Sequence, residues 1–144
     1  MELSIKNTYK IKTLTDLEAV ALSLLKDYPD TRTFIFEGNL GAGKTTFIQA
    51  LCKCLGVKEQ VTSPTYALVN EYQGAKSPIL HFDLYRLNSE RELLDIGFES
   101  YLSEETAYIF IEWPELALPF LEQAVLVKIA ALEDEERLLE VGSL

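Results

Sequence analysis

Residues 38–45 of this 144-residue chain, Gly38-Asn39-Leu40-Gly41-Ala42-Gly43-Lys44-Thr45, match the phosphate-binding pattern G-x-x-x-x-G-K-[ST]. This stretch follows a short β-rich apolar run at 33–36. It precedes a segment, 46–55, whose apolar residues recur on one helical face before Gly56. A strand, a glycine loop and a helix in this order are what phosphate binding at a helix N-terminus requires. The pattern therefore predicts a nucleotide-binding loop.

Each part of the loop has a predicted contact with a nucleotide. Glycines allow successive backbone N–H groups to curl around a phosphate, and the partial positive charge of the helix N-terminus attracts it. We expect Lys44 to be catalytic and to reach the β- and γ-phosphates of ATP, and the Thr45 hydroxyl to bind Mg²⁺. GTP is disfavoured because the sequence has no guanine-reading N-K-x-D stretch. The predicted cofactor-binding residues are Asn39, Leu40, Gly41, Ala42, Gly43, Lys44, Thr45 and Thr46.

Hydrolysis of ATP also needs a carboxylate near the phosphates, and one follows a buried-strand pattern. The apolar run at 107–111 leads directly into Glu112. A Walker-B acid usually ends such a strand beside the loop strand, at the edge of the sheet where ligands bind. We therefore predict that Glu112 is a catalytic acid and binds Mg²⁺ together with Thr45, although Asp is commoner at this position. The alternative is an ordinary exposed glutamate in a turn.

A second acid and a loop hydroxyl are further candidates. Asp83 lies in the alternating run 81–85, which puts it on one strand face with His81 and Tyr85. This face is either ordinary solvated surface or brings a second carboxylate or a base close to the phosphates. Thr65 lies in the loop that follows the predicted P-loop helix. Such a threonine can sense the γ-phosphate through Mg²⁺, as GTPase switch loops do, but its spacing alone leaves the switch role open.

Strand and helix patterns alternate along the rest of the chain, without repeats, linkers or low-complexity segments. A capping-box pattern at Thr15 and Glu18 opens the first predicted helix, and the turn at 74–78 joins two strand patterns into an antiparallel hairpin. We expect a single domain over residues 1–144 with the three-layer α/β fold of P-loop NTPases. Its sheet is expected to be mixed and mainly parallel, with the antiparallel hairpin as an extension. The predicted strands are 2–6, 33–36, 67–73, 79–84, 107–111, 124–132 and 137–141, and the predicted helices are 15–28, 46–55 and 89–95.

The negative charge of the chain is unevenly distributed. The net charge is −10 at pH 7, but residues 1–72 are neutral overall and residues 73–144 carry all of the excess. An acidic surface repels phosphate backbones, so strong direct binding of nucleic acid is disfavoured, and the acidity either serves solubility or meets a protein partner. The apolar runs fall far short of the roughly 18 residues of a membrane span, and the first residues show no secretory pattern. We expect no membrane association and a cytoplasmic location.

Four sequence blocks follow one another in a specific order: GNLGAGKTTF at 38–47, VTSPTY at 61–66 with Leu68, Val69 and Tyr72 after it, HFDLYRL at 81–87 and IEW at 111–113. In order and spacing they resemble the TsaE family, the bacterial ATPase subunit of tRNA threonylcarbamoyladenosine biosynthesis. The resemblance extends over roughly residues 15–142. The first block is shared by many P-loop proteins, whereas the other three in this order are far more specific. Asn39 and Tyr66 stand where the family frequently has Asp and Phe, which are mild departures.

The resemblance implies a small ATPase with switch-like regions that works with the TsaB and TsaD proteins. That pair transfers a threonylcarbamoyl group to adenosine 37 of tRNAs that read codons starting with A, and the ATPase supports turnover of the complex. The implied roles are phosphate and Mg²⁺ contacts for Lys44 and Thr45, the Walker-B-like acid for Glu112, a catalytic or switch carboxylate for Asp83, the switch hydroxyl for Thr65 and a conformational or nucleotide-proximal aromatic for Trp113.

Two other functions remain as alternatives. A small-molecule kinase usually clamps a second phosphate with several arginines from a lid, but this chain has four arginines and no arginine-rich insert. The four arginines also include no obvious arginine finger in cis, so we expect slow turnover by the chain alone. The second alternative is a nucleotide-gated binding module whose hydrolysis is incidental. Strong stimulation of hydrolysis by a partner would argue against a purely passive module.

Overall fold

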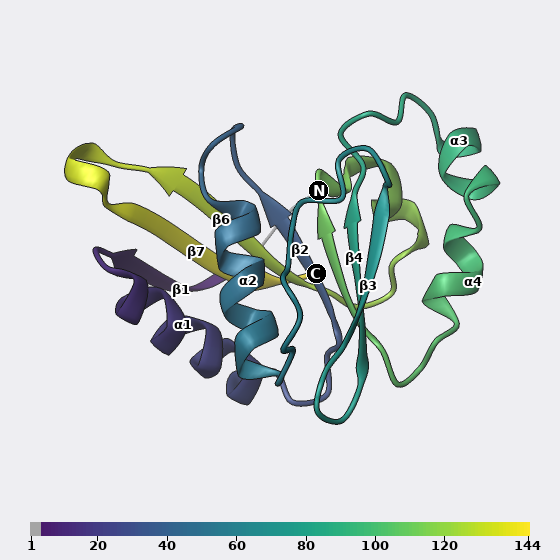
Figure 1. Ribbon diagram of the computed structural model, residues 1–144. Helices are drawn as coiled ribbons and strands as arrows, with labels where there is room; N and C mark the ends of the chain where they lie inside the picture. Colours follow the sequence, from purple (N-terminus) through teal and green to yellow (C-terminus); the bar gives the residue numbers. More distant parts are fainter. Residues whose placement is uncertain (1–3) are drawn as a thin grey trace.

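A seven-stranded sheet runs through the computed structural model, which describes residues 4–144 (Figure 1). The strands are β1 (Ser4–Ile11), β2 (Thr33–Glu37), β3 (Val69–Gln73), β4 (Pro78–Asp83), β5 (Tyr108–Glu112), β6 (Val125–Ala131) and β7 (Arg137–Ser143). Their order across the sheet is β1-β7-β6-β2-β5-β4-β3. The phosphate-binding loop follows β2, so it emerges from the middle of the sheet.

The central strands β6, β2, β5 and β4 run parallel to one another. On one side the sheet continues antiparallel through β7 and β1, and on the other side β3 pairs antiparallel with β4. The predicted α/β P-loop fold with a mixed sheet and an antiparallel hairpin is confirmed. The sheet has fewer parallel pairings than predicted, because only three of the six strand pairings in residues 4–144 are parallel. The short connection between β6 and β7 allows only an antiparallel pairing there, and β1 joins the sheet through β7.

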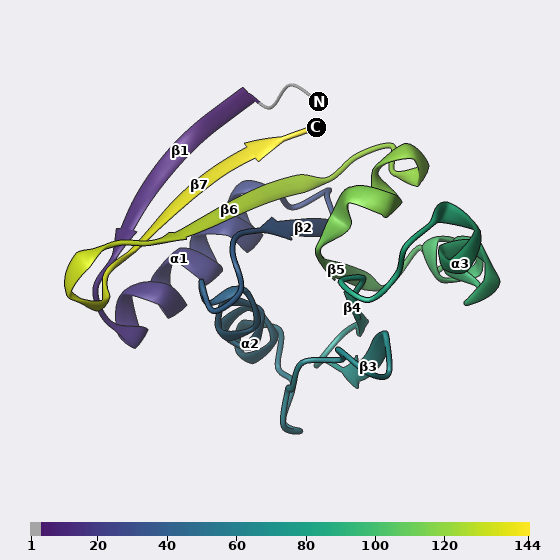
Figure 2. The same ribbon diagram turned by 90° about the horizontal axis from the view of Figure 1, so that it is seen from above.

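Helices cover both faces of the sheet and complete the three layers (Figure 2). On one face lie α1 (Leu14–Asp27) and α2 (Lys44–Cys54), and on the other lie α3 (Glu90–Asp95), α4 (Phe98–Leu102) and the 3₁₀ helix η1 (Pro114–Phe120). Side chains alternate between the faces of a strand. Phe34 and Phe36 of β2 therefore belong to the core beneath α1 and α2, whereas Ile35 belongs to the core on the opposite face. A one-turn 3₁₀ helix, η2 (Glu133–Glu135), forms the acidic turn before β7.

Three local features differ from the sequence prediction. The cap of α1 is Thr13 with Asp16, since the Thr13 hydroxyl accepts from the Asp16 N–H and the Asp16 carboxylate accepts from the Thr13 N–H. The predicted capping box at Thr15 and Glu18 is therefore wrong by two residues. The first strand reaches Ile11, because β7 offers it a long pairing partner, while the predicted positions 2 and 3 lie outside the described residues. The third difference is that the structure has two helices, α4 and η1, that the sequence did not predict. They span five and seven residues and have no side-chain cap, so neither a helical period nor a cap marks them in the sequence.

No helix within residues 4–144 has the length and apolar character needed to cross a membrane.

Candidate functional site

The phosphate-binding loop connects the C-terminal end of β2 to the N-terminus of α2. Gly43 is the N-cap residue of α2 and has φ = 107°, a left-handed conformation that side-chain-bearing residues rarely adopt. A Cβ atom on Gly38 would lie 2.5 Å from the carbonyl oxygen of Ile129, so a side chain there would collide with β6. The glycines of the motif thus serve the loop's conformation and its close packing on the neighbouring strand.

A cavity of about 280 Å³ lies at the N-terminus of α2 and brings the predicted site residues together. One wall is the loop, and the other lining residues come from the last residue of β4, from the end of β5 with the residue after it, and from the loop that follows α2. Segments that are far apart in the sequence thus meet at the carboxyl ends of the parallel strands, where ligands bind in sheets of this kind. The lining residues include all of the predicted loop residues except Asn39, together with Thr65, Asp83, Glu112 and Trp113.

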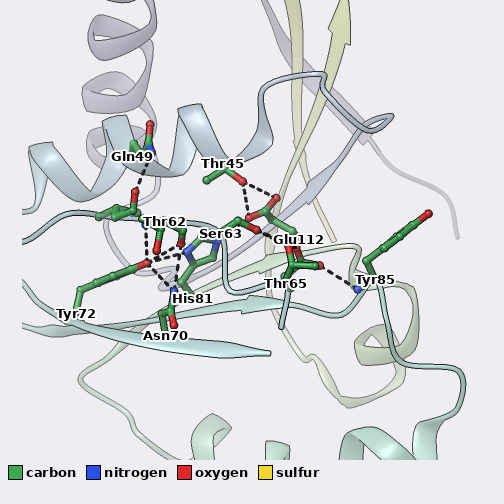
Figure 3. A network of polar contacts seen from close by, with 12 residues as sticks. Thr45, Gln49, Thr62, Ser63, Thr65, Asn70, Tyr72, His81, Tyr85 and Glu112 are labelled. Atoms are coloured by element: carbon green, nitrogen blue, oxygen red, sulfur yellow. Dashed lines mark hydrogen bonds and ion pairs between the residues drawn. The ribbon is translucent and has the colours of Figure 1, made fainter. Parts of the chain in front are cut away.

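Thr45 and Glu112 meet in this cavity (Figure 3). The Thr45 hydroxyl lies 3.1 Å from each carboxylate oxygen of Glu112, and it donates its hydrogen to that carboxylate. Glu112 is only 3% exposed, so the alternative of an ordinary exposed glutamate is wrong. A hydroxyl and a carboxylate that converge in this way fit Mg²⁺, which prefers oxygen ligands and usually keeps waters and substrate phosphates in its coordination shell.

Lys44 lies under the loop and is nearly buried. Its ammonium donates to the carbonyl oxygens of Gly38 and Asn39. It also lies 3.7 Å from the centre of the Trp113 ring, which is a close cation–π contact. Burial lowers the pKa of Lys44, while the charges of Glu112 and Asp83 oppose that shift. The predicted phosphate ligand is therefore held between loop carbonyls and an aromatic face.

Asp83 ties the loop that follows α2 to the end of β4. Its Oδ2 accepts hydrogen bonds from the hydroxyls of Thr65 and Ser63, at 3.2 and 3.3 Å, while its Oδ1 accepts from the backbone N–H of Tyr85 at 3.0 Å. Asp83 is 5% exposed and His81 is fully buried, so the face they share is not an ordinary solvated surface. The predicted switch hydroxyl is thus held by the second predicted acid.

Two polar side chains at the site were not predicted. The buried His81 donates from Nε2 to Glu112 Oε2 at 2.7 Å, and its Nδ1 lies 3.4 Å from the hydroxyl of Tyr72. The sequence placed His81 on the same strand face as Asp83, and this was the signal that could have assigned it to the site. Tyr72 is among the residues that carry the family resemblance, but no pattern in the sequence assigns its hydroxyl a role, and it lies beside His81 through the pairing of β3 with β4.

Arg137, at the start of β7, also reaches the loop. Its Nε donates to the Ala42 carbonyl at 2.9 Å, across 95 positions of sequence. It lines a neighbouring cavity of about 210 Å³ that shares Ala42, Gly43 and Thr46 with the first cavity. Neither Asp83 nor Glu112 lines this second cavity. One arginine of the chain therefore supports the loop from the side away from Asp83 and Glu112, which sequence spacing could not indicate.

A family model described as "Threonylcarbamoyl adenosine biosynthesis protein TsaE" matches residues 11–139. The chain belongs to the TsaE family. A TsaE protein of Aquifex aeolicus is 34% identical over 138 residues, which cover 94% of this chain and 89% of that protein. A TsaE protein of Nostoc is 43% identical over 84 residues, which cover 56% of this chain and about half, 51%, of that protein. Both are described as tRNA threonylcarbamoyladenosine biosynthesis proteins.

The fold is shared with a solved structure as well. The crystal structure of YdiB from Bacillus subtilis superposes with a TM-score of 0.74 at 23% identity, and the match covers 99% of this chain and 88% of that one. The TsaE model spans all four blocks on which the sequence resemblance rests, so the predicted family is confirmed. The same blocks contain the loop, the hydrogen bond between Ser63 and Asp83, and the hydrogen bond between Thr45 and Glu112 in the cavity.

Proposed function

We propose that this chain binds Mg²⁺ and ATP in the cavity at the N-terminus of α2 and hydrolyses the ATP. The observation that carries this proposal is the convergence of Thr45 and Glu112, 3.1 Å apart, beside a phosphate-binding loop that ends in Lys44. The loop N–H groups and Lys44 would hold the phosphates, while Thr45 and Glu112 would hold Mg²⁺. When bound, Mg²⁺ would neutralise charge on the β- and γ-phosphates during phosphoryl transfer.

The remaining residues of the cavity suit an ATPase whose activity depends on a switch. Asp83 would serve as the second carboxylate, and its hydrogen bond to Thr65 holds that hydroxyl in the lining of the cavity. In GTPases, a loop hydroxyl of this kind changes partners with the state of the nucleotide. Thr65 would exchange Asp83 for the nucleotide site in the same manner, and Trp113 would release Lys44 when phosphates bind.

We further propose that the ATPase serves the threonylcarbamoyl modification of adenosine 37 in tRNA, in the cytoplasm, together with the TsaB and TsaD proteins. The family membership supports this pathway, and the relatives' descriptions name it. The charge of the chain supports a role beside partners that bind the tRNA. A chain with net charge −10 is poorly suited to bind tRNA itself, because both carry negative charge. Leu40, which lines the cavity, and Tyr66, the chain neighbour of Thr65, are both exposed and would be available to such a partner.

ATP turnover and complex formation test these proposals together. Alone, the chain should hydrolyse ATP slowly, and addition of TsaB and TsaD should raise turnover, because docking orders the segments 63–66 and 81–86. Complex formation should be tighter with ATP, since linkage makes the coupling reciprocal. Bare tRNA should bind weakly and without a steep salt dependence. Partner-independent turnover, or tight and salt-sensitive binding of tRNA by this chain, would contradict the proposed role.

A further inference from the structure

A buried line of polar contacts leads from Glu112 through His81 and Tyr72 to the backbone of the segment 61–66 (Figure 3). Glu112 Oε2 accepts from Nε2 of His81 at 2.7 Å, and Nδ1 of His81 faces the hydroxyl of Tyr72 at 3.4 Å. The Tyr72 hydroxyl in turn bonds both backbone groups of Thr62, donating to its carbonyl at 2.9 Å and accepting from its N–H at 3.2 Å. Glu112, His81 and Tyr72 are each at most 5% exposed, so water does not compete for these bonds.

The hydrogen-bonding capacity of Tyr72 assigns the tautomer of His81. The Tyr72 oxygen already accepts hydrogens from the Thr62 N–H and from the side-chain amide of Asn70, which fills both of its lone pairs. It has no capacity left for a hydrogen on His81 Nδ1. We therefore assign the ring hydrogen to Nε2, where it is donated to Glu112. His81 Nδ1 is then an acceptor that faces the hydroxyl of Tyr72.

This tautomer gives the single hydroxyl hydrogen of Tyr72 two acceptors, the Thr62 carbonyl at 2.9 Å and His81 Nδ1 at 3.4 Å. It serves Thr62 in this structure, since that distance is the shorter one. A movement of the His81 ring toward Tyr72 would draw the hydrogen away from Thr62. Glu112 holds the ring at its other nitrogen, so the position of that carboxylate controls which of the two acceptors receives the Tyr72 hydrogen.

We infer that His81 is a positioning residue, which orients Glu112 through Nε2 and couples its position to the Thr62 backbone through Tyr72. This inference rests on the proposed function, in which Glu112 is a ligand of Mg²⁺. The segment that contains Ser63 and Thr65 would then respond to the occupied metal site through the protein interior, in addition to any contact with the γ-phosphate. Partners that orient metal ligands typically contribute a factor of about 10–100 in metal affinity or activity.

Mg²⁺ with ADP isolates this coupling, because ADP has no γ-phosphate to reach Thr65 directly. Amide hydrogen exchange of the segment 61–66 should be measured in ADP-saturated protein with and without Mg²⁺. In the unmodified chain, exchange of the Thr62 amide should change when Mg²⁺ is added. Tyr72→Phe removes the hydroxyl and should abolish that change. Tyr101→Phe, which makes the same substitution at a ring packed on Phe82 outside the cavity, should retain it.

Two substitutions of the histidine separate orientation from coupling. His81→Gln places an amide nitrogen near the position of Nε2, so it should keep the affinity for Mg²⁺ with ADP close to that of the unmodified chain and lose the exchange response. His81→Asn cannot reach Glu112 and should weaken Mg²⁺ binding about 10- to 100-fold. A merely structural histidine would give both variants the same Mg²⁺ affinity. Calorimetric titration of Mg²⁺ into the ADP complex measures the difference.

The possible failures are distinguishable. If ADP and Mg²⁺ do not bind to the unmodified chain, both the proposed function and this coupling are wrong. If they bind and the Thr62 amide does not respond, or if it responds equally in Tyr72→Phe, only the coupling is wrong. Tyr72→Phe changes one hydroxyl and retains the ring within the core, so it provides the test even if a histidine variant does not fold.

Discussion

The ammonium of Lys44 lies 3.7 Å from the centre of the Trp113 ring, and the same ammonium donates to the carbonyl oxygens of Gly38 and Asn39. Trp113 holds this position with φ = 57°, a left-handed conformation that is costly for a bulky residue, about 1–3 kcal/mol. The turn after β5 thus holds the indole against the lysine that is expected to bind phosphate. Phosphate binding would separate the two groups, and the tryptophan can report that separation.

The intrinsic fluorescence of the chain should therefore change when ATP binds. Trp113 is the only tryptophan in the sequence, so the signal has a single source. Lys44→Ala should abolish both the change and the binding of ATP measured by calorimetry, because it removes the charge directed at the phosphates. Lys53→Ala, on the exposed side of the same helix, is the control and should bind ATP normally. Unchanged ATP affinity in Lys44→Ala would exclude this site as the nucleotide site.

Glu112→Gln should reduce Mg²⁺-dependent hydrolysis of ATP by at least about 100-fold, the usual scale for a positioned acid or electrostatic group. The substitution keeps the shape of the side chain but removes the charge toward which Thr45 and His81 donate. ATP binding should fall less than turnover, since the loop remains intact. Steady-state kinetics over a range of Mg²⁺ concentrations measures both effects. Glu105→Gln, at an exposed position before β5, should behave like the unmodified chain.

Asp83→Asn should impair turnover through the segment it holds. The carboxylate accepts from the hydroxyls of Ser63 and Thr65 through one oxygen, and an amide nitrogen in that place cannot accept either hydrogen. We expect faster amide exchange in the segment 61–66 and a lower kcat, with a smaller effect on ATP affinity. Glu71→Gln on the exposed side of β3 removes the same charge without touching the segment. If both Asp83→Asn and Glu112→Gln turn over ATP like the unmodified chain, the assignment of the carboxylates is wrong.

The central part of the site could be predicted from the sequence because its residues are coupled to local patterns. The loop motif fixes its own conformation, and Asp83 and Glu112 each end a strand whose apolar residues are visible in the sequence. Parallel strands end at the same edge of a sheet, so two acids at two strand ends are brought together by topology alone. The register pairs Asp83 with Glu112 directly.

The contacts that the sequence did not predict are side-chain contacts whose partners no local pattern specifies. Arg137 reaches Ala42 across 95 positions, because the β6–β7 hairpin folds back beside the loop. The β3–β4 hairpin is visible in the sequence, but the direction in which the Tyr72 hydroxyl points, toward Thr62 and His81, is not. The predicted cap of α1 is wrong for a different reason. The capping-box pattern expects Glu or Gln three residues after the cap, whereas here the residue that bonds back to the Thr13 N–H is Asp16.

The cap of α1 gives a pH-dependent contribution to stability. Backbone N–H groups of Lys12 and Thr13 donate to the Asp16 carboxylate and lower its pKa below the ordinary aspartate value. A lowered folded-state pKa contributes stability that is fully present above the ordinary pKa and is lost as the pH falls through the folded-state pKa. Asp16→Asn should therefore destabilise the chain at neutral pH, and its difference from the unmodified chain should shrink at strongly acidic pH.

Urea unfolding at neutral and at acidic pH measures this effect. Thr13→Ala removes the other half of the cap and should cost about 1 kcal/mol at neutral pH. Asp30→Asn, an exposed acid beyond the end of α1, should leave the free energy of unfolding nearly unchanged. Equal destabilisation by Asp16→Asn at both pH values would show that the charge of the carboxylate is not what stabilises the helix.

Arg137 should contribute to nucleotide affinity by fixing the loop. Its Nε donates to the Ala42 carbonyl at 2.9 Å, and another guanidinium nitrogen donates to the carbonyl oxygens of Glu135 and Glu136, so the planar group joins the loop to the β6–β7 turn. Lysine offers a single ammonium in place of this fork and cannot reproduce both attachments. Hydrogen bonds to charged groups contribute about 1.5–3 kcal/mol, so Arg137→Lys should weaken ATP binding about tenfold or more.

The matched control for this substitution is Arg91→Lys, because Arg91 pairs with Asp95 on the exposed side of α3 and has no contact with the loop among the described interactions. Both variants should be titrated with ATP by calorimetry, and their thermal unfolding should be compared first, since Arg137 is only partly buried and its loss should not unfold the chain. If Arg137→Lys binds ATP as tightly as Arg91→Lys, the guanidinium does not hold the loop in its binding conformation. If both bind ATP more weakly to the same extent, the contact between Arg137 and Ala42 is not the cause of the loss.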